Sequence, residues 1–313
     1  MAVQSLSERL LHTCAACGGS CQGVAVVLTS ADEQARIAGF AQDMGIEAPF
    51  DGKGRLTRAR GRCVFLNDQG LCRIHATHGY MAKPAVCRQY PLVAVRVGPD
   101  VRVGLDPGCY THAQSWRTGP QVPTQDLMAS AVELPPQEAA FEERVVDLLQ
   151  APGMTLAQAA SVLTGEPTTG TDLPRAFAAR CVRLAADASL REKVADPATG
   201  PLFRRELLAV LDHTMGLDPD ALPPWPVLPP EGEAYALDAL SRLVWLRLAR
   251  AIPSVAGVAG LGMMGLVLCA WAAPDHAAFG RMTAAWFRAM RSPVFWGHLL
   301  PTADRLAHLL RGR

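Results

Sequence analysis

The sequence predicts a mainly α-helical protein with a small α+β, cysteine-rich, metal-binding module at its N-terminus. Three observations lead to this fold class. Seven of the nine cysteines lie between Cys14 and Cys109, a hairpin pattern occupies the same region, and alanine- and leucine-rich stretches with a helical period follow. Half of the 313 residues are apolar, which is enough to bury the core of one large domain or of two ordinary ones.

The cysteine-rich module, which we place at residues 1–118, is predicted to contain a strand, a helix and a hairpin. The run VAVVL at Val24–Leu28 is typical of a short buried strand. Ser30–Glu33 has the capping-box pattern that begins a helix. Two β-branched runs, 92–97 and 101–105, are separated by a Gly-Pro-Asp turn and predict a β-hairpin.

The rest of the chain is predicted to be helical. Residues 119–136 contain four prolines and no sustained apolar period, which indicates a linker. The domain that follows, 137–313, is expected to be helical and is interrupted at about 219–233 by a proline-rich, extended surface linker. The predicted helical stretches are 137–150, 155–164, 174–195, 201–215 and 233–251.

One stretch, Ala251–Pro274, runs for 24 residues without a charge or a histidine and is long enough to cross a bilayer. We expect a buried core helix instead, because the stretch is rich in alanine and glycine and is followed by another amphipathic pattern. The alternative is a membrane-associated segment. Pro253 lies near the start of the stretch and a further helix is predicted after its end, and both features favour the buried core helix.

Charge and N-terminal composition narrow the location and the partners. A formal net charge of +1 provides no general attraction to nucleic acid or acidic lipid, so we expect neither as a partner. Glu8 and Arg9 stand where a secretory signal would have its apolar core, which favours a cytoplasmic protein. In that reducing compartment, clustered thiols bind metal or perform redox chemistry more often than they form disulfides.

Cysteine spacing carries the strongest functional signal. The segment Cys14-Ala-Ala-Cys17-Gly-Gly-Ser-Cys21 brings three thiols into eight residues, and its glycines let the backbone wrap closely around a ligand. Its two-residue gap comes first, unlike the Cys-x3-Cys-x2-Cys order of radical enzymes that use S-adenosylmethionine. A thioredoxin-like site would need a strand before the motif, whereas the predicted strand follows it.

Four further cysteines extend this constellation. Cys63 and Cys72 flank a turn in CVFLNDQGLCRIH, Cys87 lies between two prolines in KPAVCRQYP, and Cys109 follows the predicted hairpin. The candidate metal ligands are therefore Cys14, Cys17, Cys21, Cys63, Cys72, Cys87 and Cys109. The basic residues Arg73, Lys83 and Arg88 lie beside these cysteines, where they neutralise bound thiolates, hold an acidic substrate or remain solvated.

Histidines and the two distant cysteines are weaker candidates. An imidazole could complete a metal sphere, and His75 and His78 share a turn with Cys72, which ranks them ahead of His12 and His112. Cys181 and Cys269 lie on apolar helical stripes, where we expect buried, inert thiols.

The motifs CAACGGSCQG, CVFLNDQGLCRIH and KPAVCRQYP together resemble the YkgJ-type cysteine-cluster family, described as zinc- or iron-chelating. The resemblance spans about Cys14 to Cys109 and implies that Cys14, Cys17, Cys21, Cys63, Cys72 and Cys87 match the family's cysteines. The family commonly has a double cysteine where this chain has Cys21-Gln22, so one ligand has a different source, and Cys109 is a candidate for it. Members that resemble flagellin lysine N-methylase would imply methyl transfer from S-adenosylmethionine to a protein lysine.

Three functions follow from these patterns. The first is an iron–sulfur protein with a [4Fe–4S] cluster, in which surplus thiols leave open a redox or modifying enzyme with an unknown protein or small-molecule substrate. The second is a structural zinc module that presents a helical interaction domain. The third is a protein lysine N-methyltransferase, for which no glycine-rich cofactor loop is visible in the sequence.

Overall fold

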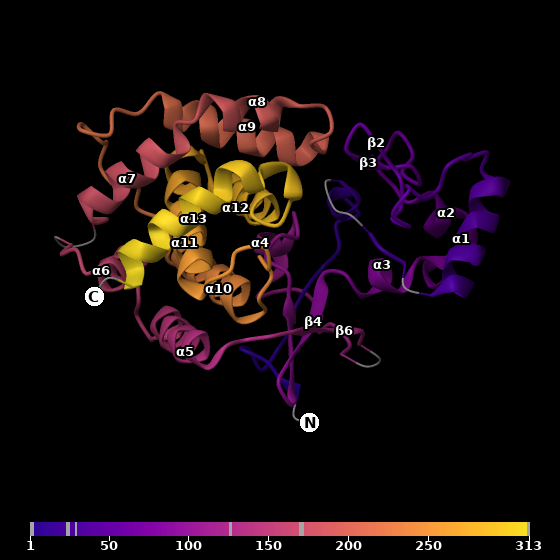
Figure 1. The fold of residues 1–313 in the computed structure, drawn as a ribbon, viewed down its shortest axis with the longest axis horizontal. Helices are drawn as coiled ribbons and strands as arrows, with labels where there is room; N and C mark the ends of the chain where they lie inside the picture. Colours follow the sequence, from indigo (N-terminus) through magenta and orange to yellow (C-terminus); the bar gives the residue numbers. More distant parts are fainter. Residues whose placement is uncertain (1–2, 23–25, 29, 125–126, 169–171, 312–313) are drawn as a thin grey trace.

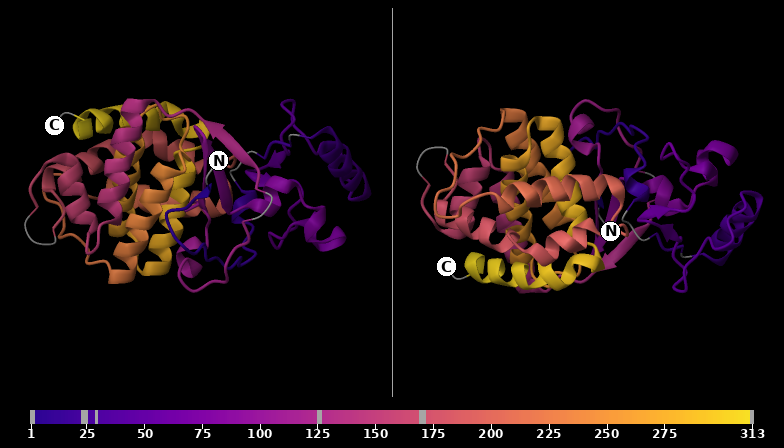
Figure 2. Two further views of the ribbon diagram at one scale, coloured as in Figure 1. Left: turned by 90° about the horizontal axis from the view of Figure 1, so that it is seen from below. Right: turned by 90° about the horizontal axis from the view of Figure 1, so that it is seen from above.

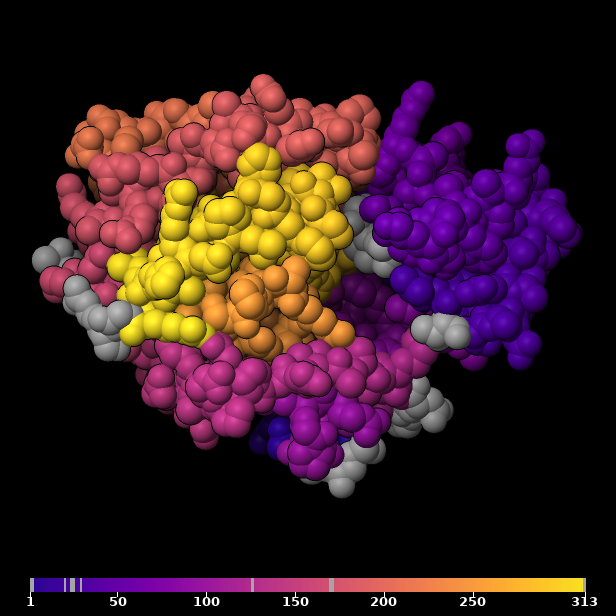
Figure 3. Space-filling view, viewed as in Figure 1, coloured from indigo at the N-terminus to yellow at the C-terminus, as the bar shows by residue number. Residues whose placement is uncertain are grey.

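The structure is a computed structural model that describes residues 3–22, 26–28, 30–124, 127–168 and 172–311. A helical body and a cysteine-rich module form two lobes, and a small sheet lies between them (Figures 1 and 2). The space-filling view shows the module as the lobe beside the helices (Figure 3). The predicted fold class is confirmed, since 53% of the residues are helical and the N-terminal part contains a small sheet.

Short elements build the cysteine-rich module. In chain order they are β1 (Val3–Gln4), η1 (Gly19–Cys21), α1 (Ala31–Asp43), β2 (Arg58–Ala59), β3 (Arg62–Cys63), α2 (Arg73–His78), η2 (Tyr80–Ala82) and α3 (Ala85–Gln89). Ser30 caps α1 as predicted, because its hydroxyl accepts a hydrogen bond from the backbone N–H of Glu33 at 3.4 Å. Ile37, Phe65 and Ile74 are fully buried at the centre of the module.

The predicted strand at Val24–Leu28 falls partly on residues 23–25, which lie outside the described residues. In the remainder, Val27 makes an isolated bridge to Arg55 and is 52% exposed, whereas Leu28 is buried. The prediction of a buried strand is therefore wrong for residues 26–28. Leu28 belongs to the apolar core of the module and Val26 packs against it, whereas the Val27 side chain points to the surface.

A mixed four-stranded sheet joins the two lobes, with the strand order β1-β5-β4-β6. The predicted hairpin is confirmed as β4 (Leu92–Val97) and β5 (Asp100–Leu105), which pair antiparallel. The outer strands β1 and β6 (Ala129–Val132) pair parallel to β5 and β4 respectively. The segment 119–136, expected to be a linker, thus contributes one edge strand before Pro135 and Pro136 lead into the next helix.

The alternation of side chains along β4 places the sheet between two cores. Val95 belongs to the large core of the helical domain, and Val93 and Val97 pack against the same core. Leu92 and Ala94 point to the other side, into a small cluster with β5. One face of the sheet therefore packs against the helices, and the other is covered by Leu10 and by residues of the segment before α5.

The helical domain surrounds a central apolar helix. Its elements are α5 (Pro136–Gln150), α6 (Leu156–Thr164), α7 (Arg175–Ala185), α8 (Ala188–Ala195), α9 (Pro201–Met215), α10 (Pro230–Trp245), α11 (Val255–Ala272), α12 (His276–Ala289), η3 (Pro293–Phe295) and α13 (Trp296–Arg311), and α4 (His112–Ser115) precedes them. By length and hydropathy α11 could span a membrane, but 89% of it is buried inside the protein. It packs against α9, α10, α12 and α13, and these contacts bury the apolar side chains that it carries on all sides.

Most predicted helical stretches match these helices to within a few residues. The exception is 174–195, which is split into α7 and α8 because Asp187 accepts hydrogen bonds from the N–H groups of Ser189 and Leu190 and so caps a new helix. The last predicted stretch begins earlier, at Pro230, a residue that suits the first turn of a helix. It ends at Trp245, shortly before Arg247 adopts a positive φ of 49°.

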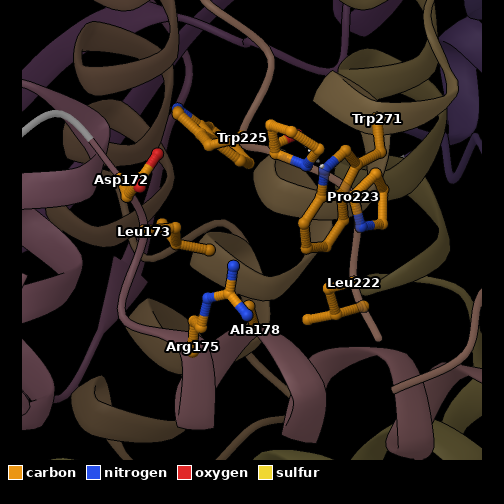
Figure 4. A pocket seen from close by; sticks show the side chains of 9 residues that line it. Asp172, Leu173, Arg175, Ala178, Leu222, Pro223, Trp225 and Trp271 are labelled. Carbon is orange, nitrogen blue, oxygen red and sulfur yellow. Dashed lines mark hydrogen bonds between the residues drawn. The ribbon is translucent and has the colours of Figure 1, made fainter. Parts of the chain in front are cut away.

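The proline-rich segment before α10 is anchored by aromatic contacts. Trp225 packs edge-to-face on Trp271 of α11, with ring centroids 5.7 Å apart, and the Trp271 indole donates to the Pro224 carbonyl at 3.4 Å. Figure 4 shows both tryptophans around a shallow pocket, with the Arg175 side chain at its edge. Its volume of about 30 Å³ holds roughly one water, so we interpret the pocket as a packing defect between the proline-rich segment and the helices beside it.

Polar and small-residue contacts lock the module to the helical domain. Arg102 of β5 forms a salt bridge with Glu142 of α5 at 2.5 Å and also donates to the Trp245 carbonyl at 2.8 Å. Gly280 of α12 lies directly against Ala113 of α4, and a Cβ at Gly280 would overlap that methyl group. This packing brings α12, which carries Arg288, against the end of the module.

Gly265 provides a test of the central packing. A Cβ there would overlap the buried ring of Trp286, whose indole donates to the Leu261 carbonyl at 3.0 Å. We expect Gly265→Ala to lower the free energy of unfolding by about 1–3 kcal/mol through overpacking, measured by chemical denaturation. Gly39→Ala is the matched control, because Gly39 lies in α1 with no atom near its virtual Cβ. That variant should be neutral or stabilised by up to about 1 kcal/mol, and equal effects of the two changes would contradict the packing.

Candidate metal centre

Four thiols from four different elements lie within electrostatic reach of one another. Cys21 ends η1, Cys63 ends β3, Cys72 is the N-cap of α2 and Cys87 lies in α3. Burial raises the pKa of the Cys87 thiol, and the charges of the other three thiols raise it further. We call Cys21, Cys63, Cys72 and Cys87 the four-thiol group.

Turn geometry in the chain explains how these segments meet. Asn67 accepts hydrogen bonds from the backbone N–H of Gly70 at 3.0 Å and of Leu71 at 2.8 Å, so the predicted turn between Cys63 and Cys72 forms. Gly18 has φ of 65° and lies so close to the Gly70 carbonyl that any Cβ would overlap it. The first cysteine loop therefore packs onto the turn of the second motif.

Burial makes these thiols weak acids as long as they have no cation. It raises the pKa of Cys21 to about 12, with Cys63 and Cys72 adding to the rise. It also raises the pKa of Cys63 to about 11, although the N–H of Phe65 partly opposes this shift. Cys21, Cys63 and Cys87 are thus neutral near pH 7, and a bound cation would have to displace their protons.

The other three candidate cysteines differ in their surroundings. Cys14 is exposed and its charge acts on Cys17, whose sulfur accepts a hydrogen bond from the N–H of Gly19 at 3.4 Å. Cys109 is buried, with its sulfur 3.9 Å from His12 Nε2. Across the described residues, which include all nine cysteines, no three His, Cys, Asp or Glu side chains converge closely enough to hold a single ion.

A buried guanidinium from the helical domain stands between the two sets of thiols. Arg288 of α12 exerts its positive charge on Cys17, Cys21 and Cys109. Its Nε donates to the Gly108 carbonyl at 2.9 Å and its Nη2 donates to the Tyr90 hydroxyl, while Nη1 is buried without a hydrogen-bond partner in the described structure. Such a buried cation requires nearby negative charge, part of which comes from the buried Asp106 carboxylate. Deprotonated thiols would add to it.

One family matches this part of the chain. Residues 13–114 match a family named CxxCxxCC, described as a putative zinc- or iron-chelating domain. The match covers about a third of the chain and agrees with the resemblance seen in the cysteine motifs. It supports metal binding by the N-terminal domain, and the matched range contains all seven candidate cysteines. No curated protein and no solved structure matches the chain.

Gln22 occupies the position at which the resemblance led us to expect a second cysteine. It is buried, and its side-chain oxygen accepts a hydrogen bond from the N–H of Leu202 at the start of α9 at 3.0 Å. The side chain therefore caps a helix of the other domain. In this CxxCxxCC domain, the residue after Cys21 links the metal-binding loop to the helical body.

Basic residues around the CxxCxxCC domain differ in their roles. Lys83 acts on both Cys21 and Cys87, in agreement with the prediction that it neutralises thiolates. Arg73 and Arg88 instead donate to backbone carbonyls, Arg73 to Met44 at 2.9 Å and Arg88 to Met81 at 3.0 Å. Sequence reasoning missed Arg288, because the only signal for it was one arginine in an amphipathic helix far along the chain.

The histidines are arranged differently from their predicted order. His78 stacks on Phe40 with ring centroids 4.1 Å apart, and His75 meets the edge of Tyr80 at 5.8 Å. His12 instead is the histidine beside a candidate cysteine, at 3.9 Å from Cys109. Proximity in sequence to Cys72 thus did not identify the histidine that lies beside a candidate cysteine. His12 reaches Cys109 because the chain returns to it after the β4–β5 hairpin.

His112 lies at the junction of the CxxCxxCC domain and the helices. Its ring is fully buried, is 6.0 Å from the Tyr235 ring between centroids, and has no hydrogen-bond partner at either nitrogen in the described structure. Burial lowers the pKa of His112 to about 3, and the charges of Arg242 and His12 lower it further. The folded protein therefore holds this imidazole neutral.

Removal of the Arg288 side chain should weaken metal retention. We expect Arg288→Ala to speed metal loss to a chelator about 10- to 100-fold, the range typical of groups that support metal ligands, and Arg288→Lys to recover part of this loss. Arg281→Ala on the same helix, whose partner is Glu206 at 3.4 Å, is the matched control and should release metal at the wild-type rate. Equal release rates for Arg288→Ala and Arg281→Ala would contradict the role of Arg288.

His112 should also make the free energy of unfolding depend on pH. The unfolded state binds a proton near the ordinary pKa of 6.5, whereas the folded state does so only near 3. The free energy of unfolding should therefore fall by a few kcal/mol, roughly, as the pH drops from 6.5 toward 3. Denaturation at several pH values should show a shallower slope, by about one proton, for His112→Gln. The exposed His308→Gln should keep the wild-type slope, and the same slope in all three proteins would refute this assignment.

Proposed function

We propose that the four-thiol group holds a [4Fe–4S] cluster and that the protein is an iron–sulfur protein of the cytoplasm. Four thiolates are the number that one such cluster requires. Cys21, Cys63, Cys72 and Cys87 supply them from η1, β3, α2 and α3. With all four irons bound by thiolates, such a cluster would supply one-electron transfer.

The spacing of the thiols is the observation that carries the proposal. The four groups influence one another electrostatically, yet no three of them stand at the spacing of a single-ion site. A tetrahedral zinc, with Zn–S distances of about 2.3 Å, needs its sulfurs within roughly 4 Å of one another. A cluster of several metal atoms accepts thiolates that are spaced more widely.

The surroundings of the group suit an anionic cluster. Phe65 and Ile74 are each 1% exposed and belong to the apolar core against which Cys63 and Cys72 pack, which limits the access of water. Lys83 and Arg288 place positive charge near Cys21. The chain's own residues would therefore exclude water and balance the charge of the bound thiolates.

A structural zinc site is the second candidate, because the same four cysteines tie four separate elements of the module together. A closed set of four thiolates is typical of structural zinc. Methyl transfer to a protein lysine gains no support from a cavity or a contact in the described residues, and we do not propose it. We expect the substrate or electron partner of an iron–sulfur centre to be a protein or a small molecule.

Anaerobic purification followed by visible spectroscopy and analysis of iron, zinc and acid-labile sulfide tests the proposal. We expect a brown protein in which Cys21→Ser and Cys87→Ser each lose most of the iron and sulfide. Cys14→Ser, at an exposed thiol, and Cys181→Ala, in the helical core, should retain them. Circular dichroism should show that the helical domain of each variant remains folded.

Two outcomes would contradict the assignment. Stoichiometric zinc without sulfide would replace the cluster with a structural zinc site. Loss of iron in Cys14→Ser to the same extent as in Cys21→Ser would show that the four-thiol group is not the ligand set.

A further inference from the structure

A basic cavity lies where the cysteine-rich module meets the helical domain. Its volume is about 280 Å³, and its lining includes Asp51, Arg55, Thr57, Arg58, Arg60 and Ala198. All of these except Ala198 come from the loop and the β2–β3 hairpin of the module. Figure 1 shows that hairpin facing the end of α8 and α9 that lies nearest the module.

The arginines that line this cavity outnumber its carboxylates. Arg55 is neutralised by Asp51, since the two side chains form a salt bridge at 2.6 Å. The side chains of Arg58 and Arg60 make no hydrogen bond and no ion pair within the described residues, so three guanidinium groups face one carboxylate. Arg58 and Arg60 are exposed and so are accessible to a ligand. Partial burial of the Arg58 guanidinium lowers its pKa and the charge of Arg55 lowers it further, whereas the charge of Asp51 opposes this shift.

The walls of the cavity are held in place by backbone contacts. Gly61 has φ of 73°, and a Cβ there would lie 2.6 Å from the backbone nitrogen of Gly200 and 2.7 Å from the Ala198 carbonyl oxygen. The preceding residue, Arg60, adopts a left-handed φ of 48°, which costs about 1 kcal/mol or more for a side chain with a Cβ. The tight contact at Gly61 thus maintains a strained arginine at the cavity.

A hydroxyl lies next to the cavity. Thr57 Oγ1 has no hydrogen-bond partner in the described structure and almost no accessible surface, so its side chain must rotate to donate into the cavity that its residue lines. Guanidinium groups and hydroxyls are donors that match the oxygens of a phosphate, and a guanidinium can bind two of those oxygens at once. The surplus of two positive charges matches a dianion.

We propose that this cavity binds a small molecule that carries a phosphate group. Its volume is close to the lower end of typical small-molecule sites, and the phosphate would receive donors from Arg58, Arg60 and Thr57. The ligand would contact both the module and the α8–α9 connection at Ala198. Its binding would therefore stabilise the junction between the two lobes.

Calorimetric titration of the full-length protein with inorganic phosphate and with pyrophosphate, at constant ionic strength, tests this site. We expect saturable binding of at least one probe and at least a tenfold rise in Kd for the double variant Arg58→Ala/Arg60→Ala. The double variant Arg117→Ala/Arg144→Ala removes the same charge from exposed arginines outside the cavity and should bind as the wild type does. That control separates a built site from general charge attraction.

Arg60→Gly tests the site without a folding penalty. Glycine adopts the positive φ at this position freely, so the variant should unfold at the same temperature as the wild type or a higher one. We expect its affinity for the bound probe to fall nevertheless, because one guanidinium is lost. Absence of saturable binding to the wild-type protein, or equal affinity in Arg58→Ala/Arg60→Ala, would overturn the proposal.

Discussion

The burial of Arg288 beside the thiols is the constraint that joins the metal centre to the rest of the molecule. A guanidinium in the interior is costly unless its charge is balanced, and Arg288 retains one buried nitrogen without a partner after bonding Gly108 and Tyr90. The Asp106 carboxylate provides part of this charge, and deprotonated thiols at Cys17, Cys21 and Cys109 would add to it. The helical domain and the metal-binding domain are therefore coupled electrostatically as well as by packing.

The packing that positions Arg288 begins far from the cysteines. The apolar helix α11 fills the centre of the helical domain, and α12 packs on it through Trp286. Because Gly280 allows α12 to approach α4 closely, the end of α12 reaches the loop that carries Cys109. The helix α11, which by length and hydropathy could span a membrane, is thus the core element on which α12 packs. This packing places Arg288 of α12 at the metal-binding domain.

Local signals in the sequence predicted local structure well. Pro201 at the start of α9, the cap at Ser30 and the β-branched runs of the hairpin act within a few residues, so their elements were found nearly to the residue. The grouping of the thiols could not be read in this way, because Cys21 and Cys87 meet only through the docking of separate loops. Arg288, 180 residues from its partner Gly108, lay beyond any pattern of spacing.

Charge alone does not distinguish a zinc ion from a cluster, because both leave four thiolates with a net negative charge that Lys83 and Arg288 can balance. Spacing does distinguish them. A single zinc would have to draw η1, β3, α2 and α3 closer together, yet the loop of Cys21 is already in contact with the Cys63–Cys72 turn at Gly18 and Gly70 and bound to α9 through Gln22. The proposed cluster, with its larger inorganic core, would instead reach thiols that stand further apart than the ligands of one zinc ion.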